Sequence, residues 1–97
     1  MQYNFEWDPH KAKANIVKHS VNFQQATEVF WDALQLTIFD EEHSDTEDRW
    51  ITLGKTQNGI LLVVMHTFSK YENNITIRII SARKATQHEQ HQYEGNQ

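Results

Sequence analysis

An Asn-Gly pair between two apolar segments constrains the fold of this chain more than any other feature. Asn58-Gly59 separates the segment Arg49–Thr56 from the segment Ile60–Phe68. Both central positions of a two-residue hairpin turn need a positive φ angle, which asparagine and glycine adopt at low cost. The two segments are therefore predicted to be neighbouring antiparallel strands. The second contains the run Ile60–Met65, which is apolar on both faces and indicates a central strand.

Three further segments have residue patterns typical of strands. Aromatic and polar residues alternate from Tyr3 to Trp7, which predicts a first strand with one aromatic face. Leu34–Phe39 predicts a short strand that leads into an acidic loop. Ile75, Ile77 and Ile79 alternate with Thr76, Arg78 and Ile80, which predicts the last strand.

A helix is predicted from Pro9 to His19. Asp8 is a favourable N-cap, and proline is well tolerated at the first helical position. The apolar stripe of this helix is thin, with Ala12 and Ile16 as its main members. We therefore expect the helix to lie on the surface and to be partly exposed.

Two more helices are predicted by their capping and composition. Asn22 and Gln25 have the spacing of a capping box, which predicts a second helix ending near Trp31. The segment Lys84–Tyr93 predicts a final helix that is unusually polar. Such a helix buries little surface unless a partner covers it.

The order of these elements predicts one α+β domain over residues 1–97. The elements follow the order strand, helix, helix, four strands, helix. This order favours an antiparallel sheet whose helices pack mainly on one face.

Composition narrows the class of protein further. The chain has no cysteine, which excludes disulfides and thiolate metal sites. Its N-terminal residues contain no basic stretch followed by an apolar run, and no apolar segment is long enough to span a membrane. We therefore expect a soluble, cytoplasmic protein without a signal peptide or a membrane contact.

The charges are unevenly distributed along the chain, whose formal net charge is −4. Asp40–Asp48 contains six acidic residues and no basic one, whereas Arg49–Thr86 contains six basic residues and one acidic one. The second segment therefore predicts a local basic surface in an acidic protein. The alternative is that exposed strands carry lysine and arginine for solubility.

Blocks of residues resemble the BrnT family, in the family's order and over nearly the whole chain. The most specific block is Arg78–Thr86, followed by Glu89, Tyr93 and Glu94. The other blocks are Phe5-Glu6-Trp7-Asp8 with Lys11-Ala12; Asn15 with Lys18-His19; Val21 and Phe23 with Ala26, Val29-Phe30 and Asp32; and Asp40 with His43-Ser44, Glu47, Arg49-Trp50 and Gly54. One departure is Ser20, where the family commonly has glycine.

The resemblance implies a RelE-like fold and an endoribonuclease activity that needs no metal ion or cofactor. The protein would be the toxin of a toxin–antitoxin pair and would inhibit translation by cleaving RNA. The substrate's own 2′-hydroxyl would be the nucleophile. The resemblance also implies a partner, a DNA-binding antitoxin similar to BrnA, through which the toxin would contact DNA only indirectly.

Metal-free RNA cleavage needs cations that stabilise the transition state and groups that move two protons. Arg49, Arg78 and Arg83 are predicted to bind the phosphate, because guanidinium groups hold phosphates in a bidentate geometry. His88 is predicted to be a general acid or base. The residues predicted to contact RNA are Lys18, His19, Lys55, Lys84 and Tyr93.

Several of these residues also have a structural interpretation. The alternative for Arg78 is an ion pair with Glu47 or another acid of its loop. Lys55 also fits the end of a half-buried strand, and Lys18-His19 fits the end of a helix, where a cation meets the helix dipole favourably. Arg83 and Lys84 fit either a phosphate site at a helix start or a plain capping region.

The remaining histidines are weaker candidates for catalytic or metal-binding residues. His66 lies on an apolar strand face, which is typical of a core residue. His43-Ser44 with Glu47 fits either an acid–base cluster or a set of loop caps. His88 and His91 have a spacing that permits a metal ion, but without a third converging ligand no metal site is predicted.

A second hypothesis is a non-catalytic binding module of the same fold that holds an antitoxin-like partner. The arrangement of the arginines distinguishes the two hypotheses. Convergence of Arg49, Arg78 and Arg83 on one open surface favours RNA cleavage. Pairing of each arginine with an acid of Asp40–Asp48 favours the binding module.

Overall fold

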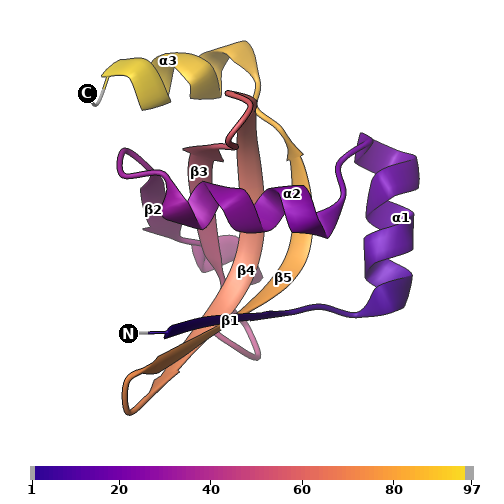
Figure 1. Cartoon of the computed structure of the whole chain (residues 1–97), viewed down its shortest axis with the longest axis vertical. Coiled ribbons are helices and arrows are strands. Elements are labelled where there is room, and N and C mark those ends of the chain that lie inside the picture. The colour runs from indigo at the N-terminus through magenta and orange to yellow at the C-terminus, as the bar shows by residue number, and fades with distance from the viewer. Residues whose placement is uncertain (1, 96–97) are drawn as a thin grey trace.

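One five-stranded sheet organises the computed structural model, which describes residues 2–95 (Figure 1). Its strands lie side by side in the order β1-β5-β4-β3-β2. They are β1 (Gln2–Glu6), β2 (Leu36–Phe39), β3 (Trp50–Lys55), β4 (Leu61–Tyr71) and β5 (Asn74–Lys84). The central position predicted for the Ile60–Met65 run is confirmed, because β4 is the middle strand.

Three α-helices complete the α+β fold. The first two precede β2 and the last follows β5; one short 3₁₀ turn follows α2, and a second lies between β2 and β3. These elements are α1 (Pro9–His19), α2 (Phe23–Thr27) with its continuation η1 (Glu28–Trp31), η2 (Glu41–His43) and α3 (Gln87–Gly95). None of the helices in residues 2–95 is long and apolar enough to cross a membrane.

The predicted hairpin between β3 and β4 is present, but its turn differs from the prediction. Gly59 has a φ angle of 82°, whereas Asn58 does not have a positive φ angle. The Gly59 N–H donates to the Thr56 carbonyl, and the Thr56 N–H donates to the Ile60 carbonyl. The loop is therefore a three-residue one, which needs a single left-handed residue at its end rather than two.

The prediction of a purely antiparallel sheet is wrong for its first strand. β1 pairs with β5 in parallel, with Gln2 opposite Asn74 and Glu6 opposite Arg78. The other neighbouring strands pair antiparallel. Alternation of side chains identifies a strand but carries no information on its neighbour, so the direction of β1 was decided by the tertiary fold.

Most of the core lies on the face of the sheet that α2 and η1 cover, here called the inner face. It carries the alternate residues Leu62 and Val64 of β4 and Ile77 and Ile79 of β5, all of them buried. The main core residues of the helices that pack on them are Phe23, Ala26, Val29 and Phe30. Figure 1 shows α2 crossing in front of the strands on this side.

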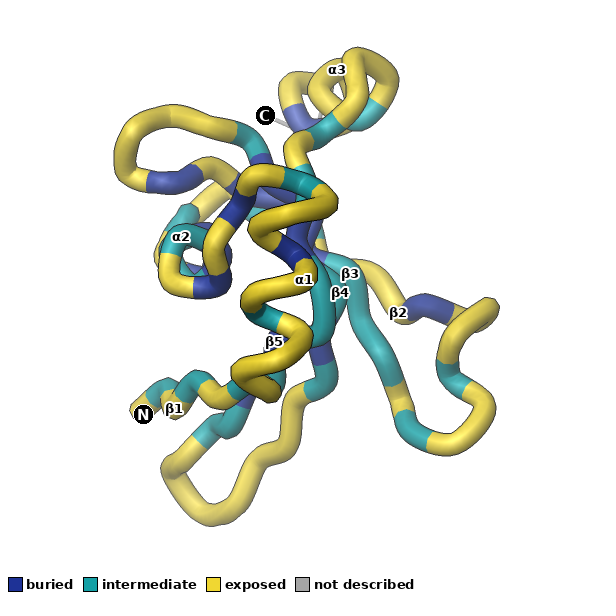
Figure 2. Tube along the Cα trace, turned by 90° about the vertical axis from the view of Figure 1, so that its right-hand side faces the viewer, coloured by how far each residue is buried: buried dark blue, intermediate teal, exposed yellow. Residues whose placement is uncertain are grey.

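The opposite face, here called the outer face, is only partly covered. Leu53 and Val63 form a smaller core cluster there with Tyr93 of α3. The helices therefore lie on both faces, although unequally. The outer sides of α1 and α3 are exposed along most of their length (Figure 2).

Asn15 attaches α1 to the edge of β5. Its side-chain amide donates to the Ala82 and Val21 carbonyls, both at 2.8 Å, and its oxygen accepts from the Ala82 N–H at 3.1 Å. The residue is only 5% exposed, while Ile16 beside it is 49% exposed. Beyond the end of β1, the Asn15 side chain thus makes the hydrogen bonds that a neighbouring strand would otherwise make with β5. The helix then terminates at Ser20, which adopts a left-handed φ of 58° where glycine would be unstrained.

His66 is a buried ionisable side chain in the core, at 2% exposure. Its Nε2 lies 2.7 Å from the Thr52 hydroxyl, and its ring packs edge-on against Phe30. Burial lowers the pKa of His66 from 6.5 to about 4, although a hydrogen bond to the Thr67 carbonyl opposes that shift. This residue is a neutral part of the core, as its position on an apolar strand face suggested.

Replacing Asn15 with alanine should lower the free energy of unfolding by about 3 kcal/mol, because buried backbone groups of Ala82 and Val21 lose their partners. Urea denaturation followed by circular dichroism measures this loss. Asn4→Ala on the exposed side of β1 is the matched control and should change stability little. Equal stability of the two variants would show that the amide does not hold α1 in place.

The free energy of unfolding should fall by about 2 kcal/mol between pH 7 and pH 5, because unfolded His66 binds a proton in this range and folded His66 does not. Since the folded pKa is the lower one, the stability is present at neutral pH and is lost on acidification. The test is a series of urea titrations across this range for the wild type and His66→Gln. The same pH slope in both proteins would contradict the assignment.

Candidate active site

A β-bulge places two of the predicted arginines on the same face of the sheet. Arg78 pairs with Thr67 and Arg83 with Val63, four residues apart on β4 but five apart on β5. The register shifts between Met65 and His66, so β5 contains one residue more than its partner. Without the bulge, an odd spacing would put the two arginines on opposite faces. With it, both lie on the outer face with Val63.

A cleft of about 430 Å³ lies between α1 and this part of β4 and β5. Lys11, Lys18 and His19 line it from α1, and Arg83 lines it from β5. The remaining lining residues are Ala14, Asn15, Met65, Ile80 and Ser81, so no acidic side chain faces the cleft. This combination of cations is suited to binding an anion such as a phosphate.

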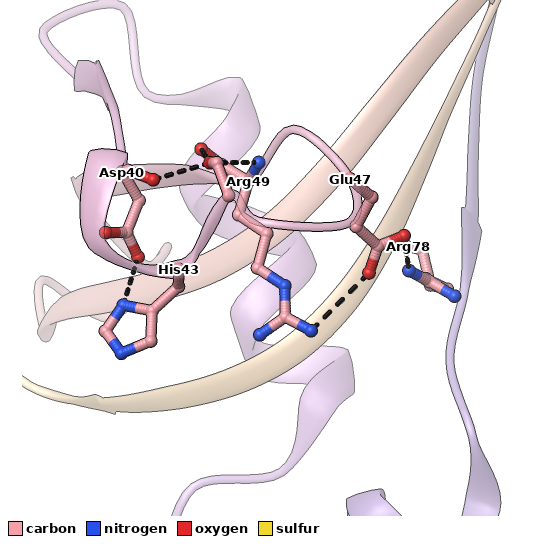
Figure 3. A network of polar contacts seen from close by, with 6 residues as sticks. Asp40, His43, Glu47, Arg49 and Arg78 are labelled. Atoms are coloured by element: carbon pink, nitrogen blue, oxygen red, sulfur yellow. Dashed lines mark hydrogen bonds and ion pairs between the residues drawn. The ribbon is translucent and has the colours of Figure 1, made fainter.

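Arg49 and Arg78 share one carboxylate, that of Glu47 (Figure 3). Arg78 Nη2 lies 2.5 Å from Glu47 Oε1, and Arg49 Nη2 lies 3.5 Å from Oε2. The Nε of Arg49 is buried and has no hydrogen-bond partner in the part of the chain that the structure describes. The two guanidiniums therefore hold one anion between them, while their side chains remain 30% and 42% exposed.

The loop that supplies Glu47 is shaped by its own hydrogen bonds. Asp40 Oδ2 lies 2.8 Å from His43 Nδ1, and the Ser44 hydroxyl donates to the Asp40 carbonyl. The Arg49 N–H in turn donates to the Ser44 hydroxyl. These contacts support the loop-capping interpretation of His43-Ser44. Within residues 2–95, no three metal-ligating side chains form a group that could hold a metal ion.

Arg83 lies within β5 and not at the start of a helix, because that strand extends to Lys84 and α3 begins only at Gln87. Its guanidinium binds Glu89 in a bidentate geometry, with both N···O distances at 2.8 Å. The hydrogen bonds from Arg83 lower the pKa of Glu89 to about 2, with smaller help from Thr86. Thr86 and Glu89 also cap each other's backbone N–H groups. The first turn of α3 is thus already capped by the side chains of Thr86 and Glu89.

The structure brings some predicted residues to the cleft and places others away from it. Lys18 and His19 line the cleft beside Arg83. Lys84 is exposed and pairs with Leu62, an inner-face residue, so it points away from Arg83. His88 is exposed on α3, next to Glu89, and forms no hydrogen bond or ion pair within the described residues.

Comparison with known proteins identifies the family. Residues 7–89 match the family of BrnT ribonuclease toxins of type II toxin–antitoxin systems. The chain belongs to the BrnT family. No curated protein sequence matches it significantly.

The fold agrees with a solved BrnT structure. The crystal structure of the ribonuclease toxin BrnT of Brucella abortus superposes with a TM-score of 0.59 at 24% sequence identity. The match covers 90% of this chain and 100% of the Brucella chain. At this identity the likeness concerns the fold, while the family match makes this chain one of the ribonuclease toxins and implies an antitoxin partner.

In this BrnT family member, Tyr93 is a core residue, and the sequence-based prediction of an RNA contact is corrected accordingly. It is 2% exposed, and its hydroxyl donates to Asp32 Oδ2 at 2.5 Å. Burial and the Asp32 carboxylate raise the pKa of Tyr93 to about 12. Burial alone would raise the pKa of Asp32, but hydrogen bonds from Tyr93, Lys55 and Leu34 lower it overall.

Lys55 belongs to the same structural cluster and not to the cleft. Its backbone N–H donates to Asp32, and its ammonium lies 5.5 Å from the centre of the Tyr93 ring. Six residues of extended strand separate it from Arg49, a distance of about 20 Å. The contacts and position of Lys55 therefore agree with its structural interpretation as the end of a strand.

Of two further residues in the candidate site, Lys11 was not singled out from the sequence, whereas Glu47 was named there as a possible ion-pair partner of Arg78, and that pair is present. Lys11 contributes a cation to the cleft, and Glu47 joins Arg49 to Arg78. Both lie in blocks that resemble the family, so the resemblance was the available signal. Their polar character alone is shared with many surface residues.

Replacing Tyr93 with phenylalanine should lower the free energy of unfolding by about 2 kcal/mol, because Asp32 loses a hydrogen bond in a partly buried site. RNA binding by the folded protein should not change. Denaturant titration and fluorescence anisotropy with a labelled RNA measure the two effects. Tyr71→Phe, at a side chain that is 77% exposed, is the matched control. Weaker RNA binding at unchanged stability would show instead that Tyr93 contacts RNA.

Proposed function

We propose that this BrnT family toxin cleaves RNA without a metal ion, on the outer face of its sheet and in the adjoining cleft. The observation that carries the proposal is the position of Arg49, Arg78 and Arg83 on one face. Arg49 precedes β3 and, by strand alternation, lies on the face of Ile51 and Leu53. Arg78 and Arg83 lie there because of the bulge in β5.

Arg49 and Arg78 are proposed to bind the scissile phosphate. They already hold a carboxylate, an anion whose oxygen spacing resembles that of a phosphate. In the transition state, negative charge grows on the non-bridging oxygens, and two fixed guanidiniums stabilise it more strongly than they stabilise the substrate. Arg83, Lys11, Lys18 and His19 would bind neighbouring phosphates along the cleft.

Glu47 and His88 are proposed to move the two protons. The Glu47 carboxylate lies between the arginines that would hold the phosphate, so it is close to the 2′-hydroxyl whose proton must leave. The 2′-oxygen then attacks phosphorus, the bond to the 5′-oxygen breaks, and a 2′,3′-cyclic phosphate forms. His88 is the proposed acid for the departing 5′-oxygen. Its neighbour Glu89 binds Arg83, which lies about 13 Å along the sheet from Arg78, so this role requires α3 to move toward Arg78 when RNA binds.

The cellular consequence proposed is inhibition of translation by cleavage of RNA in the cytoplasm. The antitoxin that the family implies would be a DNA-binding protein similar to BrnA. It would neutralise the toxin by covering the basic surface. The toxin would then reach DNA only through this partner.

One observation favours the second hypothesis, a non-catalytic binding module. Arg49 and Arg78 both pair with Glu47 of the acidic loop. Two arginines share a single carboxylate, however, and Arg83 pairs with Glu89 of α3 rather than with the loop. An excess of positive charge therefore remains on the surface, which favours RNA binding.

The proposed cleavage should occur in EDTA and should leave 2′,3′-cyclic phosphate ends on a defined single-stranded RNA. Arg78→Ala should lower the rate by about 10²–10³-fold and Glu47→Gln by about 10²–10⁴-fold, whereas Arg83→Ala should mainly weaken RNA binding. Electrophoresis of the labelled RNA and mass spectrometry of its ends measure these outcomes. Lys84→Ala, a neighbouring cation on the opposite face, should cleave at the wild-type rate.

Each negative outcome has a distinct meaning. If folded wild-type protein cleaves no RNA, with or without ribosomes, the binding module is the better hypothesis. If His88→Gln cleaves at the wild-type rate, another group protonates the leaving oxygen, and His19 in the cleft is the next candidate.

A further inference from the structure

The two edge strands of the sheet expose different side chains. The β1 edge exposes Gln2, Asn4 and Glu6, which are polar. The β2 edge exposes Ile38, at 61%, and Phe39, at 40%. Natural edge strands are usually protected by charged residues, proline or bulges, and β2 has neither a charge nor a proline. An apolar edge strand of this kind is a place where another strand can pair.

A shallow apolar groove of about 90 Å³ lies beside this edge on the outer face. Its walls are Leu36 and Ile38 of β2, Ile51 and Leu53 of β3, and Val63 of β4. Leu34, in the turn before β2, is 51% exposed and extends the apolar surface. The volume suits one aliphatic or small aromatic side chain, such as an added strand would direct toward the groove.

The charges around this edge are acidic. β2 leads directly into Glu41 and Glu42, and Asp45 and Asp48 follow in the same loop. All four side chains are exposed, and none has an ion pair within residues 2–95. The outer face is therefore divided, with a basic half over β5 and α1 and an apolar half with an acidic margin over β2.

These charges favour one occupant over two others. RNA phosphates would be repelled by the acidic margin. A second copy of the chain would bring another net charge of −4 and another acidic loop to the same edge. A protein segment with apolar residues at alternate positions would fill the groove. Lysine or arginine at its end beside Glu41 would neutralise the acidic charge.

We propose that the antitoxin adds a strand to the β2 edge, places an apolar side chain in the groove, and pairs basic residues with the acidic loop. The antitoxin follows from the family and does not depend on the mechanism of cleavage proposed above. Four residues of strand pairing are a small contact compared with the roughly 800 Å² that each partner buries in a standard interface. The groove and the loop supply the remainder.

Docking at this edge also accounts for inhibition. The groove is bounded on one side by Glu89, the carboxylate that binds Arg83. The acidic loop next to β2 contains Glu47, which binds Arg49 and Arg78. A partner docked at β2 therefore begins beside the groove that Glu89 lines and the loop that carries Glu47, and the rest of the antitoxin would extend from there over the basic surface.

The test is binding of the antitoxin of this toxin's own pair, purified, to Ile38→Lys. A lysine at this position would be buried and unpaired in the complex, so the dissociation constant should rise at least tenfold. Asn4→Lys on the other edge and Val17→Lys at an exposed apolar position of α1 add the same charge and should bind as the wild type does. Circular dichroism establishes that each variant is folded.

Hydrogen exchange gives a second measurement that does not depend on the variants. The amides of Leu36–Phe39 that point away from β3 should be protected in the complex and not in the free toxin. Wild-type affinity of Ile38→Lys with no new protection of β2 would overturn the proposal. Sedimentation of the free toxin as a dimer that Ile38→Lys dissociates would assign the edge to a second copy instead. The ribonuclease activity of free Ile38→Lys should be unchanged, so this result is separate from the test of catalysis.

Discussion

The β-bulge opposite Met65 and His66 is the constraint on which the candidate site depends. One additional residue in β5 changes which face each following side chain occupies. It brings Arg83 to the face of Arg78, and it places Ile80 and Ser81 in the wall of the cleft. The ladder is weakest where it is irregular, and here Asn15 supplies hydrogen bonds to Ala82 on the adjoining segment. The helix α1 thereby supports the bulge and also carries Lys11, Lys18 and His19.

Anions within the protein hold every arginine that is proposed to bind RNA. Glu47 bridges Arg49 and Arg78, and Glu89 binds Arg83. Such pairs keep the guanidiniums oriented before substrate arrives, which lowers the ordering cost of binding. They also explain how an acidic chain can present a phosphate site, since the positive charge is concentrated where RNA binds and the acids lie at its margins.

The last helix links the site to the core through few contacts. Tyr93 packs on Leu53 and Val63, its hydroxyl binds Asp32, and Glu89 binds Arg83. The other side chains of α3 are polar and mostly exposed. Its stability therefore depends on one buried aromatic residue and one ion pair, and a partner at the neighbouring edge would affect both the helix and the arginine.

The sequence by itself determined the local elements. Asp8-Pro9 set the start of α1, Asn22 with Gln25 set the start of α2, and the run Ile60–Met65 made β4 central. The blocks that resemble BrnT led to the family and to Arg49, Arg78 and Arg83 as candidates. These features are encoded within a few neighbouring residues, so capping and alternation of side chains reveal them.

Only the tertiary structure decided how those elements combine. The parallel pairing of β1, the bulge in β5, the burial of Asn15 and the shared carboxylate of Glu47 all join residues that are distant in sequence. Alternation places Arg78 and Arg83 on opposite faces, and the fold reverses that result. Tyr93 looked like a surface residue of a polar helix, yet it is buried against strands some thirty to forty residues earlier. Periodicity describes one segment at a time, whereas burial and convergence depend on which segments pack together.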